Sequence, residues 1–193
     1  MIIPGLTAPD RGDNRVVPIR RWPVGPSLVL ASLWIVLSAQ APTGLIDVRL
    51  RALFPAASRF TGKEGTPPHF KVFGSSAAGG EPVVIGYAFL TTDLEPLETG
   101  YDGPIQMLVG ISPRGILAGV EVLAHREPYG YFSVEPPAFA AQFAGKDVRD
   151  PFKVGEDIEA ISRATITINS ATRAIRNSAR RFARQMLTPP PPR

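Results

Sequence analysis

The sequence contains no cysteine and only two histidines, His69 and His125. The lack of cysteine excludes disulfide bonds, thiolate zinc sites, iron–sulfur clusters and cysteine-attached haem from this chain. Two isolated histidines argue against a transition-metal site, and we expect no metal and no hydrolytic catalytic group. Any redox chemistry is therefore left to an organic cofactor.

Acidic residues are missing from the last part of the chain. No Asp or Glu occurs after Glu159, whereas seven arginines follow it: Arg163, Arg173, Arg176, Arg180, Arg181, Arg184 and Arg193. The surplus positive charge predicts contact with anions. Because the aromatic platforms and motifs of nucleic-acid-binding proteins are absent, we expect no nucleic-acid partner. A phosphate-bearing ligand, an anionic lipid or a solvated helix face remain as explanations.

What is present suits one folded domain with an attached segment. The chain has 193 residues, of which 44% are hydrophobic, while its 21 prolines and 18 glycines exceed average usage. Such a composition predicts a real core surrounded by many turns and loops.

The N-terminal part has the pattern of a membrane anchor. Residues 1–21 are polar and contain four arginines, and residues 22–46 contain no charged residue. A helix over residues 22–46 would be roughly 37 Å long, enough to cross the hydrocarbon core of a bilayer. The alternative is a signal peptide cleaved after Ala41, which would release a soluble protein, but Pro42 directly after that site disfavours cleavage.

The remaining pattern predicts an α+β domain, preceded by the single N-terminal transmembrane helix. We treat residues 47–69 as a linker, residues 70–187 as the domain and residues 188–193 as a proline-rich tail. Strands are expected at residues 69–74, 82–92, 105–111 and 116–125, forming an antiparallel sheet. A short helix at 136–145 and a C-terminal helix from about Ser170 to Leu187 should pack with it.

The motif "SRAT" precedes the C-terminal helix. It offers hydroxyls from Ser162 and Thr165, a cationic fork from Arg163 and a small Ala164 that permits close approach. A turn that leads into a helix N-terminus also binds phosphate readily. These residue types could build a phosphate site, although Ser and Thr at this position are more often simple helix caps.

Four stretches occur in one order along the chain: "IGYAF" (85–89), "TGYDGPIQMLVGISPRGILAGVEVLAHREP" (99–128), "FAAQFAGK" (139–146) and "DIEAISRATITINSATRAI" (157–175). In these stretches the chain resembles the FMN-binding domain of the flavin subunits of sodium-pumping NADH:quinone reductase and Rnf complexes, and of NosR/NirI-type regulators. The resemblance covers about residues 70 to 185.

The resemblance implies an FMN cofactor joined through its phosphate to the threonine that ends the family motif S-G-A-T, here Thr165 rather than Thr167. It also places His125 and Glu127 near the flavin, and Gly100 and Tyr101 in the loop that shapes its pocket. It further implies a domain on the periplasmic side of a bacterial inner membrane, with other membrane or periplasmic redox proteins as partners and the lipid bilayer contacted through residues 22–46. Such a chain is an electron-transfer subunit rather than a stand-alone enzyme.

Two departures from the family motif leave alternatives open. The family's aspartate is Glu159 here, and the glycine of S-G-A-T is Arg163. If the glycine serves a positive φ angle, arginine there costs about 1 kcal/mol and could block attachment of the flavin. Otherwise Arg163 could pair with the phosphate. A cofactor-free structural or regulatory membrane subunit that keeps the fold is the second interpretation.

Overall fold

The computed structural model describes residues 44–75 and 81–187. Within these ranges the helices are α1 (Leu45–Leu53), α2 (Thr91–Leu94), α3 (Gly130–Ser133), α4 (Pro137–Ala141) and α5 (Thr165–Met186). The strands are β1 (Ala57–Phe60), β2 (Phe70–Gly74), β3 (Val83–Leu90), β4 (Gln106–Ile111) and β5 (Leu117–Ala124). The predicted α+β class is confirmed for the domain.

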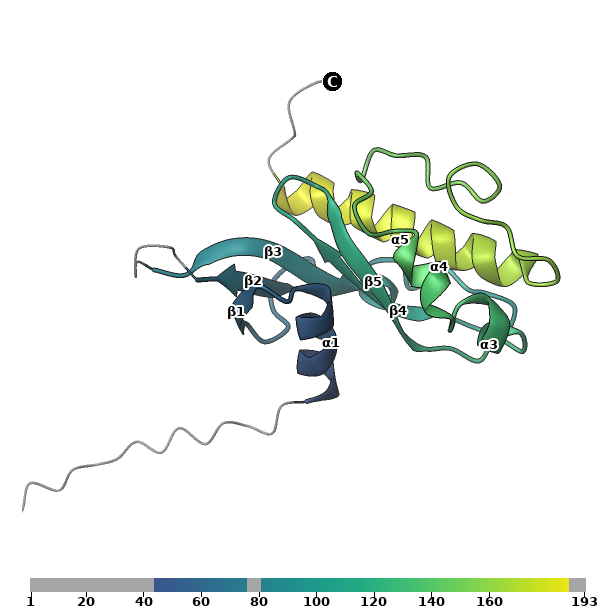
Figure 1. Ribbon diagram of the computed structural model, residues 1–193, viewed down its shortest axis with the longest axis horizontal. Helices are drawn as coiled ribbons and strands as arrows, with labels where there is room; N and C mark the ends of the chain where they lie inside the picture. Colours follow the sequence, from purple (N-terminus) through teal and green to yellow (C-terminus); the bar gives the residue numbers. More distant parts are fainter. Residues whose placement is uncertain (1–43, 76–80, 188–193) are drawn as a thin grey trace, which may run out of the picture. The chain divides into compact units, whose positions relative to one another are not determined.

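The five strands form one antiparallel sheet in the order β1-β2-β3-β4-β5 (Figure 1). Each strand pairs with the next one along the chain, as predicted for β2 to β5. Between β4 and β5 the N–H of Gly115 donates to the carbonyl of Ser112 at 3.0 Å, and Gly115 has a φ of 83°, which glycine adopts without strain. The turn therefore closes where the sequence places proline and glycine.

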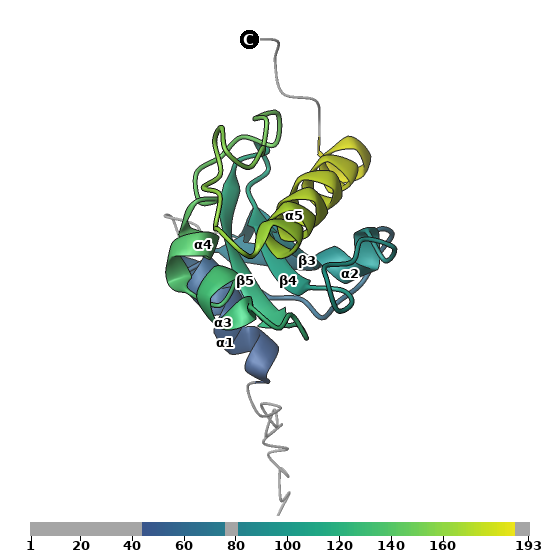
Figure 2. The same cartoon turned by 90° about the vertical axis from the view of Figure 1, so that its right-hand side faces the viewer.

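Helix α5 covers one face of the sheet (Figure 2). Its buried Ile168, Ile175 and Phe182 recur every seven residues, which puts them on one side of the helix. The Phe182 ring stacks on Phe89 of β3 with 4.7 Å between ring centroids. The helix begins at Thr165 rather than near Ser170, so the whole "TITIN" stretch belongs to its first turns.

A second, smaller core lies on the opposite face of the sheet. It contains Leu50, Leu53 and Phe54 from the α1 region, which pack against residues of the strands such as Leu108 of β4. Because side chains alternate along a strand, the neighbouring Met107 and Val109 face the α5 side of the sheet. The ring of Phe54 lies against Gly86 and Gly110, where an added Cβ would approach it to 2.5 Å and 2.9 Å. Both glycines therefore let α1 approach the sheet closely.

Two further features differ from the sequence-based expectations, and the expected anchor and tail are largely untested. Helix α1 and strand β1 lie largely within residues 47–69, for which the sequence predicts a linker. Helix α4 spans only Pro137–Ala141 of the helix expected at 136–145. Residues 1–21, the tail and all but the last residues of the proposed anchor lie outside the described residues, and no helix within 44–75 and 81–187 is long and apolar enough to cross a membrane.

Candidate functional site

Glu127 joins three segments that are distant in the sequence. It follows β5 and its side chain is buried, with 6% of the residue exposed. Its carboxylate accepts hydrogen bonds from the backbone N–H groups of Tyr101 and Asp102, each at 3.0 Å, and from the Thr167 hydroxyl in the first turn of α5. The carboxylate thereby fixes the 100–103 loop against the N-terminus of α5.

These hydrogen bonds also set the charge state of Glu127. Burial by itself raises the pKa of this carboxyl, but the hydrogen bonds from Thr167, Asp102 and Tyr101 and the proximity of His125 outweigh burial. The pKa therefore lies below its ordinary value of 4.5, and Glu127 is ionised at neutral pH. A buried carboxylate with three donors provides a rigid anchor for the loop and the helix.

Gly100 and Gly103 shape the loop that Glu127 holds. A Cβ on Gly100 would collide with the Glu127 carboxylate, so only glycine permits this approach. Gly103 has a φ of 103°, and the carbonyl of Gly103 accepts the N–H of Gly100 at 2.7 Å. Tyr101 lies at the tip of the turn with 69% of its surface exposed. The loop therefore presents an aromatic ring to solvent from a fixed backbone.

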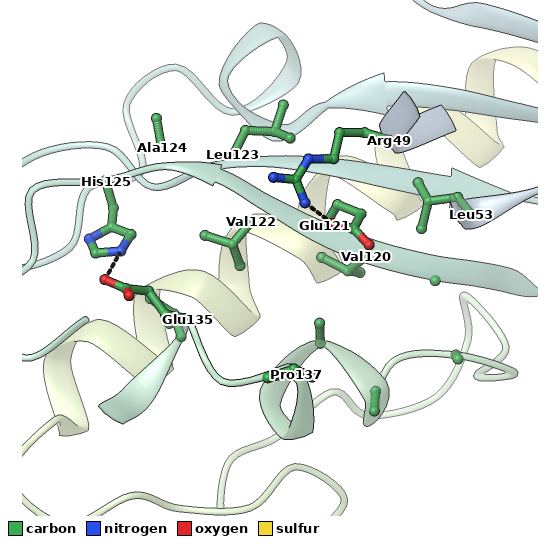
Figure 3. A pocket seen from close by; sticks show the side chains of 15 residues that line it. Arg49, Leu53, Val120, Glu121, Val122, Leu123, Ala124, His125, Glu135 and Pro137 are labelled. Carbon is green, nitrogen blue, oxygen red and sulfur yellow. Dashed lines mark hydrogen bonds and ion pairs between the residues drawn. The ribbon is translucent and has the colours of Figure 1, made fainter. Parts of the chain in front are cut away.

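His125 links this site to a neighbouring groove (Figure 3). Its Nδ1 accepts the backbone N–H of Glu127 at 3.1 Å, so Nε2 carries the proton and faces Glu135 at 3.2 Å. The groove, with a volume of 810 Å³, runs along β5 toward α4, and Arg49 and Glu121 form an ion pair of 2.9 Å at its other end. Of the residues predicted for the site, His125 alone lines the groove.

The motif residues form the turn that leads into α5. Ser162, Arg163 and Thr165 are exposed, and Ala164 is buried at the N-cap position. No side chain caps the helix, and none of the described residues accepts a hydrogen bond from the backbone N–H groups of the first three helical residues. An uncapped helix start with free N–H groups is the arrangement that binds an anion.

Thr165 and Thr167 have opposite environments. Thr167 is 3% exposed and donates its hydroxyl to Glu127. Thr165, at the first helical position, is exposed, and its hydroxyl makes no hydrogen bond within the described part of the chain. The structure thus gives Thr167 an internal structural role and leaves the hydroxyl of Thr165 available.

Arg163 occupies a backbone conformation that favours glycine. Its φ is 68°, and in the described residues the only other non-glycine residue with positive φ is Phe152. The left-handed region costs a side-chain-bearing residue roughly 1–2 kcal/mol. A left-handed backbone at this position gives a physical reason for the glycine of the family motif, which this chain replaces with arginine. Its guanidinium makes no ion pair with any described carboxylate and lies at the surface.

Three residues without a predicted role brace the segment that leads to the motif. The Gln142 side-chain oxygen accepts the backbone N–H of Glu159 at 2.6 Å, and Lys146 forms an ion pair of 3.0 Å with Asp157. Asp157 also accepts the backbone N–H groups of Phe152 and Lys153. Gln142 and Lys146 are the polar members of "FAAQFAGK", and this spacing is the sequence signal for their role. They hold the loop before Thr165 against the end of α4.

The arginines of α5 are used largely within the domain. Arg173 pairs with Glu98 at 2.7 Å and Arg181 pairs with Glu95 at 3.0 Å, which ties α5 to the segment after α2. Arg180 donates to the backbone carbonyls of residues 148 and 150. Much of the positive charge of this helix therefore serves contacts within the domain, in contrast to the solvated helix face considered from the sequence.

Comparison with known proteins agrees with this arrangement. Residues 100–180 match the family model described as the FMN-binding domain. The matched range contains the 100–103 loop, Glu127 and the start of α5. The resemblance inferred from the sequence is confirmed, and the cofactor that the family indicates is FMN.

Curated relatives with related names match about half of the chain. The G component of the ion-translocating oxidoreductase complex of Shewanella baltica is 30% identical over 113 residues, which are 53% of this chain and 50% of the relative. The protein of the same name from Pseudomonas aeruginosa is 33% identical over 93 residues, 43% and 44% of the two chains. The G component of the Na(+)-translocating ferredoxin:NAD(+) oxidoreductase complex of Acetobacterium woodii is 28% identical over 103 residues, 49% and 48%. The chain spans about half the length of the curated relatives it matches.

Proposed function

We propose that this chain is a membrane-anchored, extracytoplasmic flavoprotein that carries FMN on Thr165 and relays electrons between other proteins of a membrane redox complex. The observation that carries the proposal is the free hydroxyl of Thr165 at the uncapped start of α5. The anchor lies within the uncharged stretch 22–46 and ends before α1 begins at Leu45. The names of the relatives, components of ion-translocating oxidoreductase complexes, support the assignment to such a complex.

The residues around Thr165 suit a flavin phosphate. The free N–H groups of the first helical turn and the positive end of the α5 dipole would stabilise the phosphate, and Arg163, two residues before Thr165, can add a cation. Ser162 offers a further hydroxyl, and the small Ala164 leaves room for a close approach. The neighbouring hydroxyl of Thr167 is occupied by Glu127 and does not compete for attachment.

The exposed aromatic rings near this helix start can cover a flavin ring. Glu127 attaches the Tyr101 loop to α5, and Tyr131, on α3 shortly after Glu127, is 68% exposed. Bound FMN would supply electron transfer at its isoalloxazine ring. The protein's contribution is to hold the phosphate, to orient the ring between its loops and to keep Glu127 ionised beneath the loop.

Attachment needs an activated flavin phosphate. Thr165 would supply the Oγ that forms the new O–P bond, while the P–O bond between the flavin phosphate and its activating group would break. The activating group would leave, and the hydroxyl proton would pass to a base or to solvent. No electrons are transferred in this step. The exposed position of Thr165 leaves it accessible to an enzyme that carries the donor.

In-gel flavin fluorescence of the chain purified from its own membranes tests the proposal. The denatured wild-type chain should fluoresce, Thr165→Val should abolish the signal, and Thr165→Ser should keep it because a hydroxyl remains. Thr167→Val is the matched control, since it removes a threonine hydroxyl two residues away and should retain the flavin. Fluorescence that survives Thr165→Val, or that is absent from the wild-type chain, would contradict the proposal.

The second candidate is a cofactor-free subunit that uses the fold for assembly. The conformational cost at Arg163 favours it, because that residue departs from the family motif. A docking role for the arginines of α5 is disfavoured, since Arg173 and Arg181 already pair with Glu98 and Glu95. This candidate predicts an unmodified chain in native membranes and an unaffected complex after Thr165→Val.

A further inference from the structure

Helix α1 has two unlike sides. Leu50 and Leu53 are buried against the sheet. On the opposite side Leu45 is 88% exposed and Val48 is 56% exposed, and Arg51 and Ala52 are exposed beside them. Because residues 45, 48, 51 and 52 lie on one side of a helix, we call these four residues the outer face of α1. Two large apolar side chains next to each other on so short a helix need a partner.

The helix starts directly after the uncharged stretch. Residues 22–46 contain no charged side chain, and Leu45 and Ile46 are both the end of that stretch and the first turn of α1. Gly44 has an extended backbone, with φ −64° and ψ 158°, so α1 is a new helix and not the continuation of a helix through Gly44. The outer face of α1 therefore follows the proposed membrane anchor directly in the sequence, with Gly44 between them.

The charges on α1 suit an anionic surface. Arg51 lies with its guanidinium carbon 5.5 Å from the centroid of the Phe60 ring and forms no ion pair with a described carboxylate. Arg49 on one flank is neutralised by Glu121, and the single acidic residue of the helix, Asp47, lies on the other flank. The outer face thus combines two apolar side chains with one arginine that forms no direct ion pair with a described carboxylate, the composition of a short interfacial helix.

We propose that the outer face of α1 lies in the headgroup region of an anionic membrane. This inference rests on the anchor in the proposed function but not on the flavin. Leu45 and Val48 would enter the boundary between headgroups and acyl chains, and Arg51 would contact lipid phosphate. Since α5 packs on the opposite face of the sheet, the sheet would separate α5 from the membrane surface.

The absence of cysteine permits a direct test, because a single introduced cysteine is labelled without background. The full chain, as Val48→Cys or Leu97→Cys, is labelled with an environment-sensitive fluorophore and reconstituted into vesicles of phosphatidylcholine and phosphatidylglycerol. Leu97 is the matched control: it is 93% exposed and lies between Glu95 and Glu98, both paired with arginines of α5. Spin-labelled lipids with the label just below the headgroup then quench the fluorophore.

The label at position 48 should emit at shorter wavelength and be quenched at least about two-fold more than the label at position 97, as expected for a helix buried about 5–10 Å into the interface. Arg51→Glu in the Val48→Cys chain, or vesicles of phosphatidylcholine alone, should reduce the difference. Equal quenching at both positions would overturn the proposal. So would a difference in quenching that changes neither with the lipid charge nor with Arg51→Glu. Flavin content is measured on the same samples, and its loss would affect the flavin assignment alone.

Discussion

Replacing Arg163 with glycine should stabilise the fold. Arg163 has a φ of 68° and makes no ion pair with a described carboxylate, so the substitution removes the left-handed strain and little else. The relief is roughly 1–2 kcal/mol. Glycine also has more conformational freedom in the unfolded chain, which lowers the free energy of unfolding by about 0.4–1 kcal/mol. The free energy of unfolding should therefore rise by about 0.5–1 kcal/mol, or Tm by about 2–3 °C for a domain of this size.

Denaturant and thermal unfolding of the purified chain, followed by circular dichroism, measure this difference. Gly155→Ala is the control, because it introduces a side chain at a position of positive φ instead of removing one. Gly155 has a φ of 87°, and an added Cβ would meet no atom within 4 Å. It should lower stability by a similar amount. If Arg163→Gly left stability unchanged or lowered it, while Gly155→Ala behaved as expected, the arginine side chain would be making a stabilising contact that outweighs its strain.

Three further substitutions test the site and the helix that carries it. Glu127→Gln should lower the free energy of unfolding by about 1.5–3 kcal/mol at neutral pH, because it replaces a buried carboxylate that accepts three hydrogen bonds. Since the pKa of Glu127 is depressed in the folded state, its contribution is complete above the ordinary value of 4.5 and is lost as pH falls through the folded value, so the two unfolding curves should converge in acid. Gly100→Ala should destabilise by about 1–3 kcal/mol through the clash with the same carboxylate. Arg181→Glu should cost no more than about 1 kcal/mol, because its pair with Glu95 is partly exposed, and Glu95→Arg in the same chain should restore stability.

Each of these expectations has a result that contradicts it. A pH-independent difference between Glu127→Gln and the wild-type chain would show that the charge of Glu127 is not the stabilising feature. A fully stable Gly100→Ala chain would mean that the loop adjusts without Glu127. If the Arg181→Glu, Glu95→Arg double variant were as unstable as Arg181→Glu alone, Arg181 would contribute to stability through contacts other than its ion pair with Glu95.

The sheet could be predicted from the sequence because its strands carry strong local signals. Alternating apolar runs and the "SPRG" turn predict β2 to β5 with nearly correct bounds. Helix α1 and strand β1 were not predicted, since their buried residues depend on contacts with the sheet. Phe54, for example, fits only because Gly86 and Gly110 lie beneath it, and both glycines are far away in the sequence.

The candidate site was partly predictable. The resemblance to the FMN-binding family selected Thr165, Glu127 and Gly100, and the structure brings Glu127 and the loop of Gly100 together with the first turn of α5. The hydrogen bond between Glu127 and Thr167 could not be read from spacing, because the partners are 40 residues apart. The sequence suggests a positive φ angle at Arg163 only indirectly, because the family motif has a glycine at this position. Residue type limits what a position can do, and the tertiary contacts decide which of two threonines is free.

An intact-mass spectrum of the chain purified from its own membranes tests the central claim most directly. We predict a gain of about 438 Da, FMN less one water, that is lost in Thr165→Val and retained in Thr167→Val. The same spectrum reports whether the N-terminal residues of the anchor remain. An unmodified wild-type mass, or an equal gain in the Thr165→Val chain, would contradict attachment of the flavin at Thr165.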